Sequence, residues 1–424
     1  MTTATTTGAT ALQPAAVAEG PVAVSLVFDD GLTSQYKLAP MFRDHGVRAT
    51  FYLNSGALDT RGGAGTMSWE WVRELATAGH EIGGHTVNHV AITGRRLTFR
   101  QKWRQVCNDR ARLIAQGFHV NTFAYAEGAL DDRAKAIVRG CGYQSARKAG
   151  SLWPGGPYRA ETVPPIFGAY ELQVLGVRHN GPMSLDSLQA AVTAASTHGG
   201  GWLPILFHRV CHPGTDSYDK CMNSYRPVDA TVVKKFLDWA AGQPGVTFRT
   251  VSEVLNGGVL TPRVRVTRPA TGATVKVGRP RLAGTAQGSG AVRVRIYKGA
   301  YSVGKPLRVL GTKAVRGQWK AMPGKPLRNG KYTVQASQSS DGVTGTSVPV
   351  TIRIRPESAS SRTRSPNPIP GPSQRRVTRR WASPTSSSRA SMKRPVADRS
   401  RLMFSARMAA ARTRAWFELR ANSA

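Results

Sequence analysis

The sequence predicts an α/β domain built on parallel strands, followed by an all-β sandwich and a basic tail. Strand-like runs alternate with helical patterns up to about residue 258, and a repeated β-then-α order is typical of a parallel sheet or barrel. After Gly257-Gly258 the helical patterns stop and short strands separated by Gly, Pro and Asn follow. The expected divisions of the chain are residues 1–20, 21–258, 262–355 and 356–424.

The first strand is predicted where Val22, Val24, Leu26 and Phe28 alternate with smaller residues, because a period of two places them on one face of a sheet. Further strand-like runs lie at 48–53, 122–125, 143–146, 203–207 and 246–250. Helical patterns lie between several of them, at 69–78, 99–116, 132–139, 185–195 and 230–241. In the second domain we expect a sandwich of about seven strands, including runs at 264–267, 292–297, 332–336 and 348–354.

Positive charge is concentrated in the C-terminal part of the chain. The 424 residues include 59 Lys+Arg and 24 Asp+Glu, for a formal charge of +35, and the net charge is +5 over 1–261, +18 over 262–355 and +12 over 356–424. Such a surface binds polyanions by counterion release, whether nucleic acid, anionic wall polymer or anionic lipid. Nucleic-acid binding is favoured only by the net charge, and no recognisable nucleic-acid-binding motif accompanies it. We therefore predict no specific nucleic-acid partner.

The N-terminal segment is rich in Thr and Ala and ends in Ala16-Val17-Ala18, a small-residue pattern like a secretory cleavage site. A basic start and a solid apolar stretch are missing, so it is either an incomplete signal peptide or a disordered tail. No run of 18 or more apolar residues is present, so we expect no transmembrane helix.

The four cysteines show no Cys-x-x-Cys spacing, which argues against a structural zinc ribbon. Two disulfides or four buried thiols are open, and two disulfides have three connectivities. We predict pairing of Cys107 with Cys141, from neighbouring βα units, and of Cys211 with Cys221 across a loop. These pairings favour a secreted protein.

Three motifs offer complementary chemistry. Asp29 and Asp30 end the first strand, where α/β barrels place catalytic groups. His85 and His89 are four residues apart and can bind one metal from a helical turn or a tight loop. His208 closes the strand-like run 203–207. Each motif alone has a structural explanation, as a turn, a chance surface spacing or a buried histidine, but their conjunction favours a metal-dependent hydrolase.

The motifs also resemble, in order, three blocks of the polysaccharide deacetylases, a family of metal-dependent carbohydrate esterases with a distorted (β/α) barrel. The resemblance covers about residues 21–256, and its blocks are Val27-Phe28-Asp29-Asp30-Gly31, Gly79-His80-Glu81-Ile82-Gly83-Gly84-His85-Thr86-Val87-Asn88-His89 and Ile205-Leu206-Phe207-His208.

Carried over by position, the resemblance assigns roles to five residues. It implies that Asp30, His85 and His89 bind a divalent metal, that Asp29 is the general base and that His208 is the general acid. Zinc is the expected metal, and the ligand set also accepts cobalt or nickel. The implied activity is removal of acetyl groups from an acetylated polysaccharide by a secreted or wall-associated enzyme.

A fourth block departs from the family. Where one subgroup reads Phe-Ala-Tyr-Pro-Tyr-Gly, this chain has Phe123-Ala124-Tyr125-Ala126-Glu127-Gly128. The resemblance implies that the backbone N–H of Glu127 is the oxyanion donor, which survives the substitution. The arginine that usually orients the base is missing at Ala124, and we predict Arg147 as its substitute.

The second domain resembles bacterial immunoglobulin-like modules, in Thr267-Arg268-Pro269-Ala270-Thr271-Gly272-Ala273-Thr274, Gly317-Gln318-Trp319 and Asn329-Gly330-Lys331-Tyr332-Thr333-Val334. We expect this domain to determine where the protein is retained rather than to take part in the chemistry. An anionic wall polymer is the expected partner of the basic C-terminal part. The competing hypothesis is a non-catalytic glycan- or wall-binding protein, which has no need for a base beside a metal ligand. The tail is expected to be disordered; its late stretch 402–419 is either a basic amphipathic segment or sequence without an evolved function.

Overall fold

A computed structural model describes residues 20–58, 65–176 and 182–356 of the chain. They belong to one compact unit, Met1–Arg362, and a second unit, Thr363–Ala424, lies outside the described residues. The predictions for residues 1–19 and for the tail beyond residue 356 therefore remain predictions.

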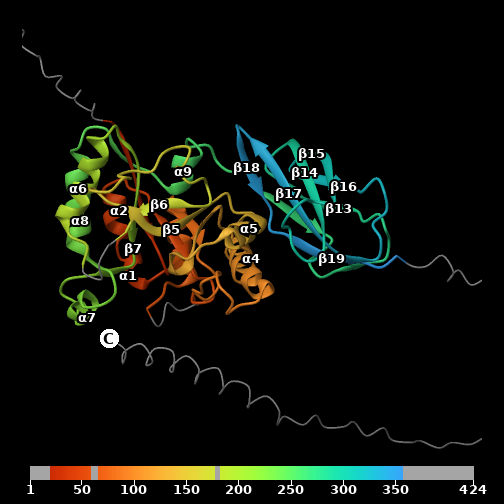
Figure 1. Ribbon diagram of the computed structural model, residues 1–424, viewed down its shortest axis with the longest axis horizontal. Coiled ribbons are helices and arrows are strands. Elements are labelled where there is room, and N and C mark those ends of the chain that lie inside the picture. The colour runs from red at the N-terminus through yellow and green to blue at the C-terminus, as the bar shows by residue number, and fades with distance from the viewer. Residues whose placement is uncertain (1–19, 59–64, 177–181, 357–424) are drawn as a thin grey trace, which may run out of the picture. The chain divides into compact units, whose positions relative to one another are not determined.

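Parallel strands form a closed ring in the first part of the chain (Figure 1). Each of the first six strands pairs with the next in chain order, and β7 pairs back onto β1 along the whole length of β1. The strands of this sheet are β1 (Val22–Phe28), β2 (Thr50–Leu53), β3 (Glu81–Gly84), β4 (Thr122–Ala124), β5 (Ser145–Leu152), β6 (Leu172–Leu175), β7 (Gly201–Phe207) and β10 (Val246–Phe248).

The ring is distorted at β1. On the side away from β7, β1 pairs with β10 through Val22–Val24 and with β2 through Val27 and Phe28. The pairing of β3 with β4 is also reduced, to Gly84 opposite Phe123. The predicted parallel α/β architecture is confirmed, and all but one of the residues of β1 are buried, as expected for a strand of a parallel sheet that is covered on both faces.

Helices cover the outside of the ring, as Figure 1 shows for α6 and α8, which pack against each other. Most of the longer helices begin at side chains that accept a hydrogen bond from the first turn, such as Ser68, Thr98 and Asp131, which are residues that favour N-caps. The helices are α1 (Thr33–Tyr36), α2 (Ala39–Asp44), α3 (Trp69–Thr77), α4 (Phe99–Ala115), α5 (Asp132–Gly140), α6 (Leu185–Ser196), α7 (Tyr218–Met222), α8 (Ala230–Ala241) and α9 (Val251–Leu255), with a 3₁₀ turn at Ala126–Gly128.

The ring has an apolar inner core and a larger outer one. Val27, Tyr52, Leu172 and Leu206 belong to the inner cluster, which draws on strands all around the ring, whereas Phe28 and its even-numbered neighbours pack outward. Since side chains alternate along a strand, the parity that places Val27 inside also directs the next odd residue, Asp29, inward. The alternation along β1 therefore directs the Asp29 side chain into the barrel, at the C-terminal end of the strand.

Several elements escaped the sequence patterns. The strand expected at 143–146 begins at Ser145 and continues to Leu152, and β3, β6 and four short helices were not anticipated. The reason is clearest in β3, whose sequence contains two glycines. A Cβ on Gly84 would lie 2.0 Å from the hydroxyl of Tyr143, so glycine is required by close approach rather than by strand propensity.

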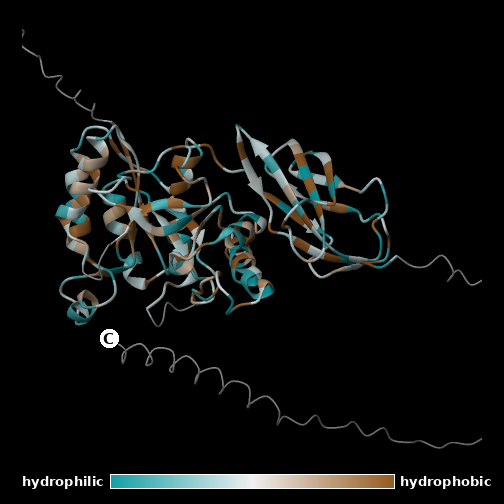
Figure 2. Ribbon diagram, viewed as in Figure 1, coloured by the Kyte–Doolittle hydropathy of each residue, from teal (hydrophilic) through white to brown (hydrophobic). Residues whose placement is uncertain are grey.

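The C-terminal described part is all-β and has its own core. Its sheets contain three and six strands, and Val264, Trp319, Val294 and Val334 from the two sheets share one cluster. Hydrophobic and hydrophilic residues alternate along β14 (Figure 2). The strands are β11 (Val264–Arg268), β12 (Thr274–Val275), β13 (Leu282–Ala286), β14 (Gly290–Lys298), β15 (Arg308–Ala314), β16 (Gln318–Ala321), β17 (Gly330–Ser340), β18 (Val343–Thr346) and β19 (Val350–Ile354), rather than about seven.

Both predicted disulfides are present. Cys107 of α4 is bonded to Cys141, the residue after α5, and Cys211 is bonded to Cys221 of α7. Cys211 ends β8 (Arg209–Cys211), which pairs in parallel with β9 (Pro227–Asp229). Among the helices of the described residues, none has the length and hydrophobicity needed to cross a bilayer.

Candidate active site

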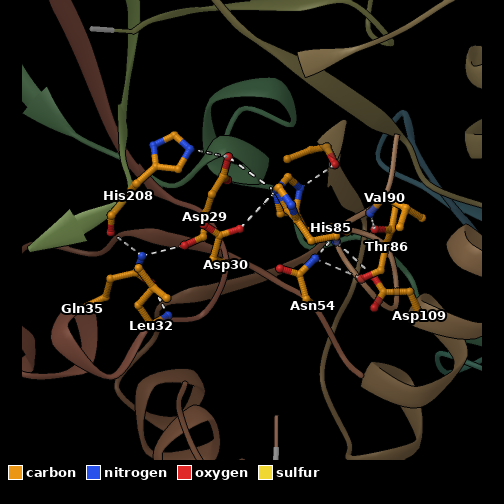
Figure 3. A network of polar contacts seen from close by, with 12 residues as sticks. Asp29, Asp30, Leu32, Gln35, Asn54, His85, Thr86, Val90, Asp109 and His208 are labelled. Carbon is orange, nitrogen blue, oxygen red and sulfur yellow. Dashed lines mark hydrogen bonds and ion pairs between the residues drawn. The ribbon is translucent and has the colours of Figure 1, made fainter. Parts of the chain in front are cut away.

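The residues of all three motifs meet at the C-terminal end of the barrel strands (Figure 3). Asp29 and Asp30 follow β1, His85 and His89 lie on the loop after β3, and His208 follows β7. Because parallel strands end at the same edge of a barrel, residues widely separated in sequence arrive at one place. The site residues predicted from the three motifs are thus brought together.

Asp30, His85 and His89 form the single group in the described residues that could hold a metal ion. Asp30 Oδ1 lies 3.6 Å from His85 Nε2 and 3.4 Å from His89 Nε2. Asp30 Oδ1 and His85 Nε2 are buried and have no hydrogen-bond partner among the described residues. An orphaned buried acceptor costs free energy, so the donor set fits a divalent cation.

A backbone carbonyl fixes the orientation of the His85 ring. Its Nδ1 lies 2.8 Å from the carbonyl oxygen of Ala124, so Nδ1–H donates to that oxygen and Nε2 keeps its lone pair for the cluster. Burial lowers the pKa of His85, more than the nearby Asp29 and Asp30 raise it. The imidazole is thereby held neutral, which is the form that binds a metal.

The backbone around His85 is held by Asn54 and Asp109 (Figure 3). Asn54 Nδ2 donates to the carbonyl oxygens of His85 and Thr86. Asp109 Oδ2 accepts from the His85 N–H at 3.0 Å, and its Oδ1 accepts from the Ser55 N–H at 3.0 Å. Burial raises the pKa of Asp109 to about 7, although these hydrogen bonds oppose the shift.

Asp29 is buried and ion-paired with Arg147. Arg147 Nη2 contacts Asp29 Oδ1, which leaves Oδ2 facing His85 Nε2 at 3.7 Å and His208 Nε2 at 3.9 Å. Burial alone would raise the pKa of Asp29, but the positive charge of Arg147, together with the histidines, lowers it below its usual value. Asp29 is therefore held as a carboxylate with one oxygen free.

Arg147 reaches Asp29 from the strand beside the altered block. On β5 it lies directly opposite Ala124 of β4 in the strand register, and it is 1% exposed with its guanidinium 4.6 Å from the centre of the Tyr52 ring. The arginine that the family resemblance expects at Ala124 is thus matched by one on the neighbouring strand, at the adjacent position.

Gln35 ties the two sides of the site together. Its Nε2 donates to the carbonyl oxygens of Asp29 at 2.6 Å and His208 at 2.7 Å, and its Oε1 accepts from the Leu32 N–H (Figure 3). Gln35 is fully buried. Burial lowers the pKa of His208, which Asp29 opposes.

The site also concentrates unusual backbone conformations. Asp30, Thr86, His89 and Glu127 have φ between 50° and 75° and make up half of the eight non-glycine residues with positive φ in the described chain. Such conformations are uncommon outside glycine, especially for the β-branched Thr86. They cost free energy and are kept where the surrounding structure enforces them, often at functional sites.

Three of these supporting residues were missed from the sequence. Asp109 gave a usable signal, because it lies on the buried face of α4, three residues after Val106 and four before Leu113. Asn54 and Gln35 gave none, because each contacts backbone groups that are far away in the sequence. The Glu127 side chain is exposed, and this residue lies in the turn that follows β4.

Comparisons with known proteins support the family resemblance over part of the chain. Residues 17–146 match the model of the polysaccharide deacetylase family. The matched stretch contains Asp29, Asp30, His85 and His89 and stops one residue before Arg147. The matches therefore support a polysaccharide deacetylase domain, and with it an enzyme, in the first part of the chain.

A curated relative and several solved structures carry related names. YxkH of Bacillus subtilis (strain 168), named as a polysaccharide deacetylase, is 28% identical over 124 residues, which are 28% of this chain and 42% of that protein. A chitin deacetylase from Colletotrichum lindemuthianum aligns with 18% identity, 56% of this chain, 90% of that chain and a TM-score of 0.37. The catalytic domain of a peptidoglycan N-acetylglucosamine deacetylase from Eubacterium rectale ATCC 33656 aligns with 14% identity over 57% of this chain and 93% of that chain, with a TM-score of 0.32.

Proposed function

We propose that the barrel hydrolyses acetyl groups from an N-acetylated extracellular polysaccharide, with O-acetyl groups as alternative substrates. The observation that carries this proposal is a pair of buried atoms without hydrogen-bond partners, Asp30 Oδ1 and His85 Nε2. They lie beside the Asp29 carboxylate, which His208 also faces. A site that only stabilised the fold would satisfy these atoms. The chemistry they allow is metal-assisted hydrolysis.

Asp30, His85 and His89 would hold the cation, and their mixed nitrogen and oxygen donors suit zinc, with cobalt or nickel as alternatives. When bound, the cation supplies a Lewis acid for the acetyl carbonyl and lowers the pKa of a water molecule. Three protein ligands leave coordination positions open, which is typical of catalytic rather than structural sites.

Asp29 and His208 would move the protons. Asp29 Oδ2 takes a proton from water while the water oxygen bonds to the acetyl carbon, and His208 donates a proton to the sugar nitrogen while the C–N bond breaks. The products are acetate and a free amine. His208 must regain a proton after each turnover, and the proton that Asp29 has taken from water lies close by, because Asp29 Oδ2 and His208 Nε2 are 3.9 Å apart.

Arg147 and Glu127 would assist. Arg147 fixes the Asp29 carboxylate by its charge and keeps it ionised, while the Glu127 N–H stabilises the developing oxyanion. The left-handed φ of 59° at Glu127 supports a backbone held for such a purpose. Exposure of the Glu127 side chain lets solvent screen its negative charge.

The non-catalytic alternative draws on the altered block at Ala124, Ala126 and Glu127. A glycan-binding barrel, however, gains nothing from a buried base with a dedicated arginine partner, which is costly to desolvate. We therefore prefer the enzyme.

We also propose a secreted or wall-associated location. Two disulfides favour an oxidising compartment. The all-β part is proposed to be an immunoglobulin-like module whose charge, +18 over residues 262–355, helps to retain the enzyme on an anionic wall polymer. Such retention would weaken with salt.

An acetate-release assay tests the function. The purified protein is incubated with chitin oligomers, peptidoglycan, poly-N-acetylglucosamine and acetylated xylan, with and without a chelator. We expect release from at least one N-acetylated polymer, loss with chelator and recovery on adding zinc. Metal-loaded protein that binds these polymers but releases no acetate would favour the non-catalytic alternative.

A further inference from the structure

An exposed aromatic side chain lies beside the proposed general acid. Tyr225 is 56% exposed, and its ring centre is 6.0 Å from that of His208, with the two rings nearly perpendicular. Tyrosine is enriched at binding interfaces, because it joins a large apolar ring to a polar hydroxyl. The three motifs and the proposed mechanism make no use of it.

The segment that carries Tyr225 is held firmly. The disulfide between Cys211 and Cys221 closes the loop that ends four residues before Tyr225, and the parallel pairing of β8 with β9 places Arg209 opposite Pro227, two residues after Tyr225. The Val210 N–H also donates to Ser34 Oγ, which joins the segment to α1. A constrained side chain loses little conformational entropy when a ligand binds.

Arg226 stiffens the ring itself. Its guanidinium carbon lies 4.8 Å from the centre of the Tyr225 ring, a cation–π contact, and Arg226 adopts a left-handed φ of 49°. The backbone reversal at Arg226 brings a cation over the ring that precedes it, while more than half of the Tyr225 surface stays open.

We propose that Tyr225 is a sugar-binding platform that packs against a pyranose ring of the polymer adjacent to the acetylated sugar. This inference rests on the proposed function. The flat apolar ring matches the flat C–H face of a pyranose, and the hydroxyl provides a hydrogen-bond partner for the sugar rim. Because His208 would face the leaving nitrogen, a ring one contact away meets the neighbouring sugar rather than the acetyl group.

The platform would act on binding of long substrates. An interaction remote from the reacting bond, equally strong in the ground and transition states, changes KM more than kcat. A small acetyl ester presents no neighbouring sugar and cannot use it. Tyr225 would thus select a polymer over a small acetylated molecule.

The test uses the full chain and two probes, a β-1,4-linked N-acetylglucosamine tetramer and 4-nitrophenyl acetate. Tetramer binding is measured by calorimetry in the Asp29→Asn background, and turnover of both probes is measured with Asp29 intact. We expect Tyr225→Ala to raise the tetramer Kd about tenfold, about 1.4 kcal/mol, and to reduce kcat/KM for the tetramer about tenfold more than for the ester.

Matched variants separate the ring from its surroundings. Tyr225→Phe and Tyr225→Trp should keep the tetramer Kd within about threefold, whereas Tyr225→Leu should resemble Tyr225→Ala, because a branched side chain offers no flat face. Phe167→Ala is the control for loss of an exposed aromatic. Phe167 is 46% exposed and lies at the opposite end of the barrel from Tyr225. Its neighbours Pro164 and Pro165 line a cavity together with Thr122 and Ser145, which are the first residues of β4 and β5.

The outcomes distinguish this inference from the proposed function. A tetramer Kd that Tyr225→Ala leaves unchanged, an absence of tetramer binding, or equal losses with Tyr225→Phe and Tyr225→Ala would overturn the platform, even if the enzyme releases acetate. Tyr225-dependent tetramer binding by a protein that releases no acetate would support the platform and overturn the proposed function.

Discussion

Both ends of the barrel contain carboxylates, but these carboxylates differ in whether their oxygens have hydrogen-bond partners. At the N-terminal end, Glu81 accepts hydrogen bonds from the Thr50 and Thr122 hydroxyls and from the N–H and hydroxyl of Ser252. At the C-terminal end, Asp30 Oδ1 is buried without a partner. Full satisfaction of Glu81 fits a structural role, whereas the unpartnered oxygen of Asp30 is the basis for its proposed role as a metal ligand.

The largest expected effect concerns Asp29. Asp29→Asn should reduce acetate release by about 10³-fold or more, because the base is lost, while the bound metal measured by elemental analysis stays near the level of the unmodified protein. His85→Ala should lose both metal and activity, because it removes a ligand. Full activity of Asp29→Asn would show that the base is another group.

Arg147 provides the next test, because its positive charge compensates the buried negative charge of Asp29 at the C-terminal end of the barrel. Arg147→Ala should lower acetate release by about 10²-fold and the free energy of unfolding by about 3–5 kcal/mol, since Asp29 is left buried and unpaired. Denaturant unfolding and acetate release measure the two effects.

A matched variant addresses the altered block directly. The double variant Ala124→Arg with Arg147→Ala moves the guanidinium to the register-paired position on β4. Partial recovery of acetate release relative to Arg147→Ala would support equivalence of the two positions. Equal activities of Arg147→Ala and the unmodified protein would refute the positioning role.

Glu81 should show the opposite balance. Glu81→Ala leaves four donors, three hydroxyls and one N–H, without their acceptor and should lower the free energy of unfolding by about 2–4 kcal/mol. Metal content and acetate release per folded molecule should change less than twofold. A loss of metal in this variant would break the contrast between the two ends.

An exposed pair on the outer wall provides the smallest effect. The hydrogen bond from His45 to Asp238 raises the pKa of His45 above its usual value, with burial opposing. Stability from this pair is present below the unfolded histidine pKa near 6.5 and is lost as pH rises through the raised pKa of the folded state. Thermal unfolding between pH 5 and 8 should show a smaller pH dependence in His45→Gln; identical profiles would exclude the contribution.

The sequence by itself determined which chemical groups are present and near which strand ends they lie. Apolar alternation in β1 predicted the strand that ends at Asp29 and Asp30, and helical periods predicted the helices between the strands, because these patterns are local. The spacing of four between His85 and His89 predicted shared ligation for the same reason. Both disulfide pairings followed from neighbouring βα units and a short loop.

Tertiary structure alone decided which distant groups meet. Arg147 and Asp29 are 118 residues apart, and Gln35 is 173 residues from His208; their contacts depend on strand register and on closure of β7 onto β1. The pairing of β8 with β9 brings the chain back so that Tyr225 lies beside His208. A local pattern fixes the face on which a side chain lies, whereas the partner on that face is set by how strands far apart in sequence align.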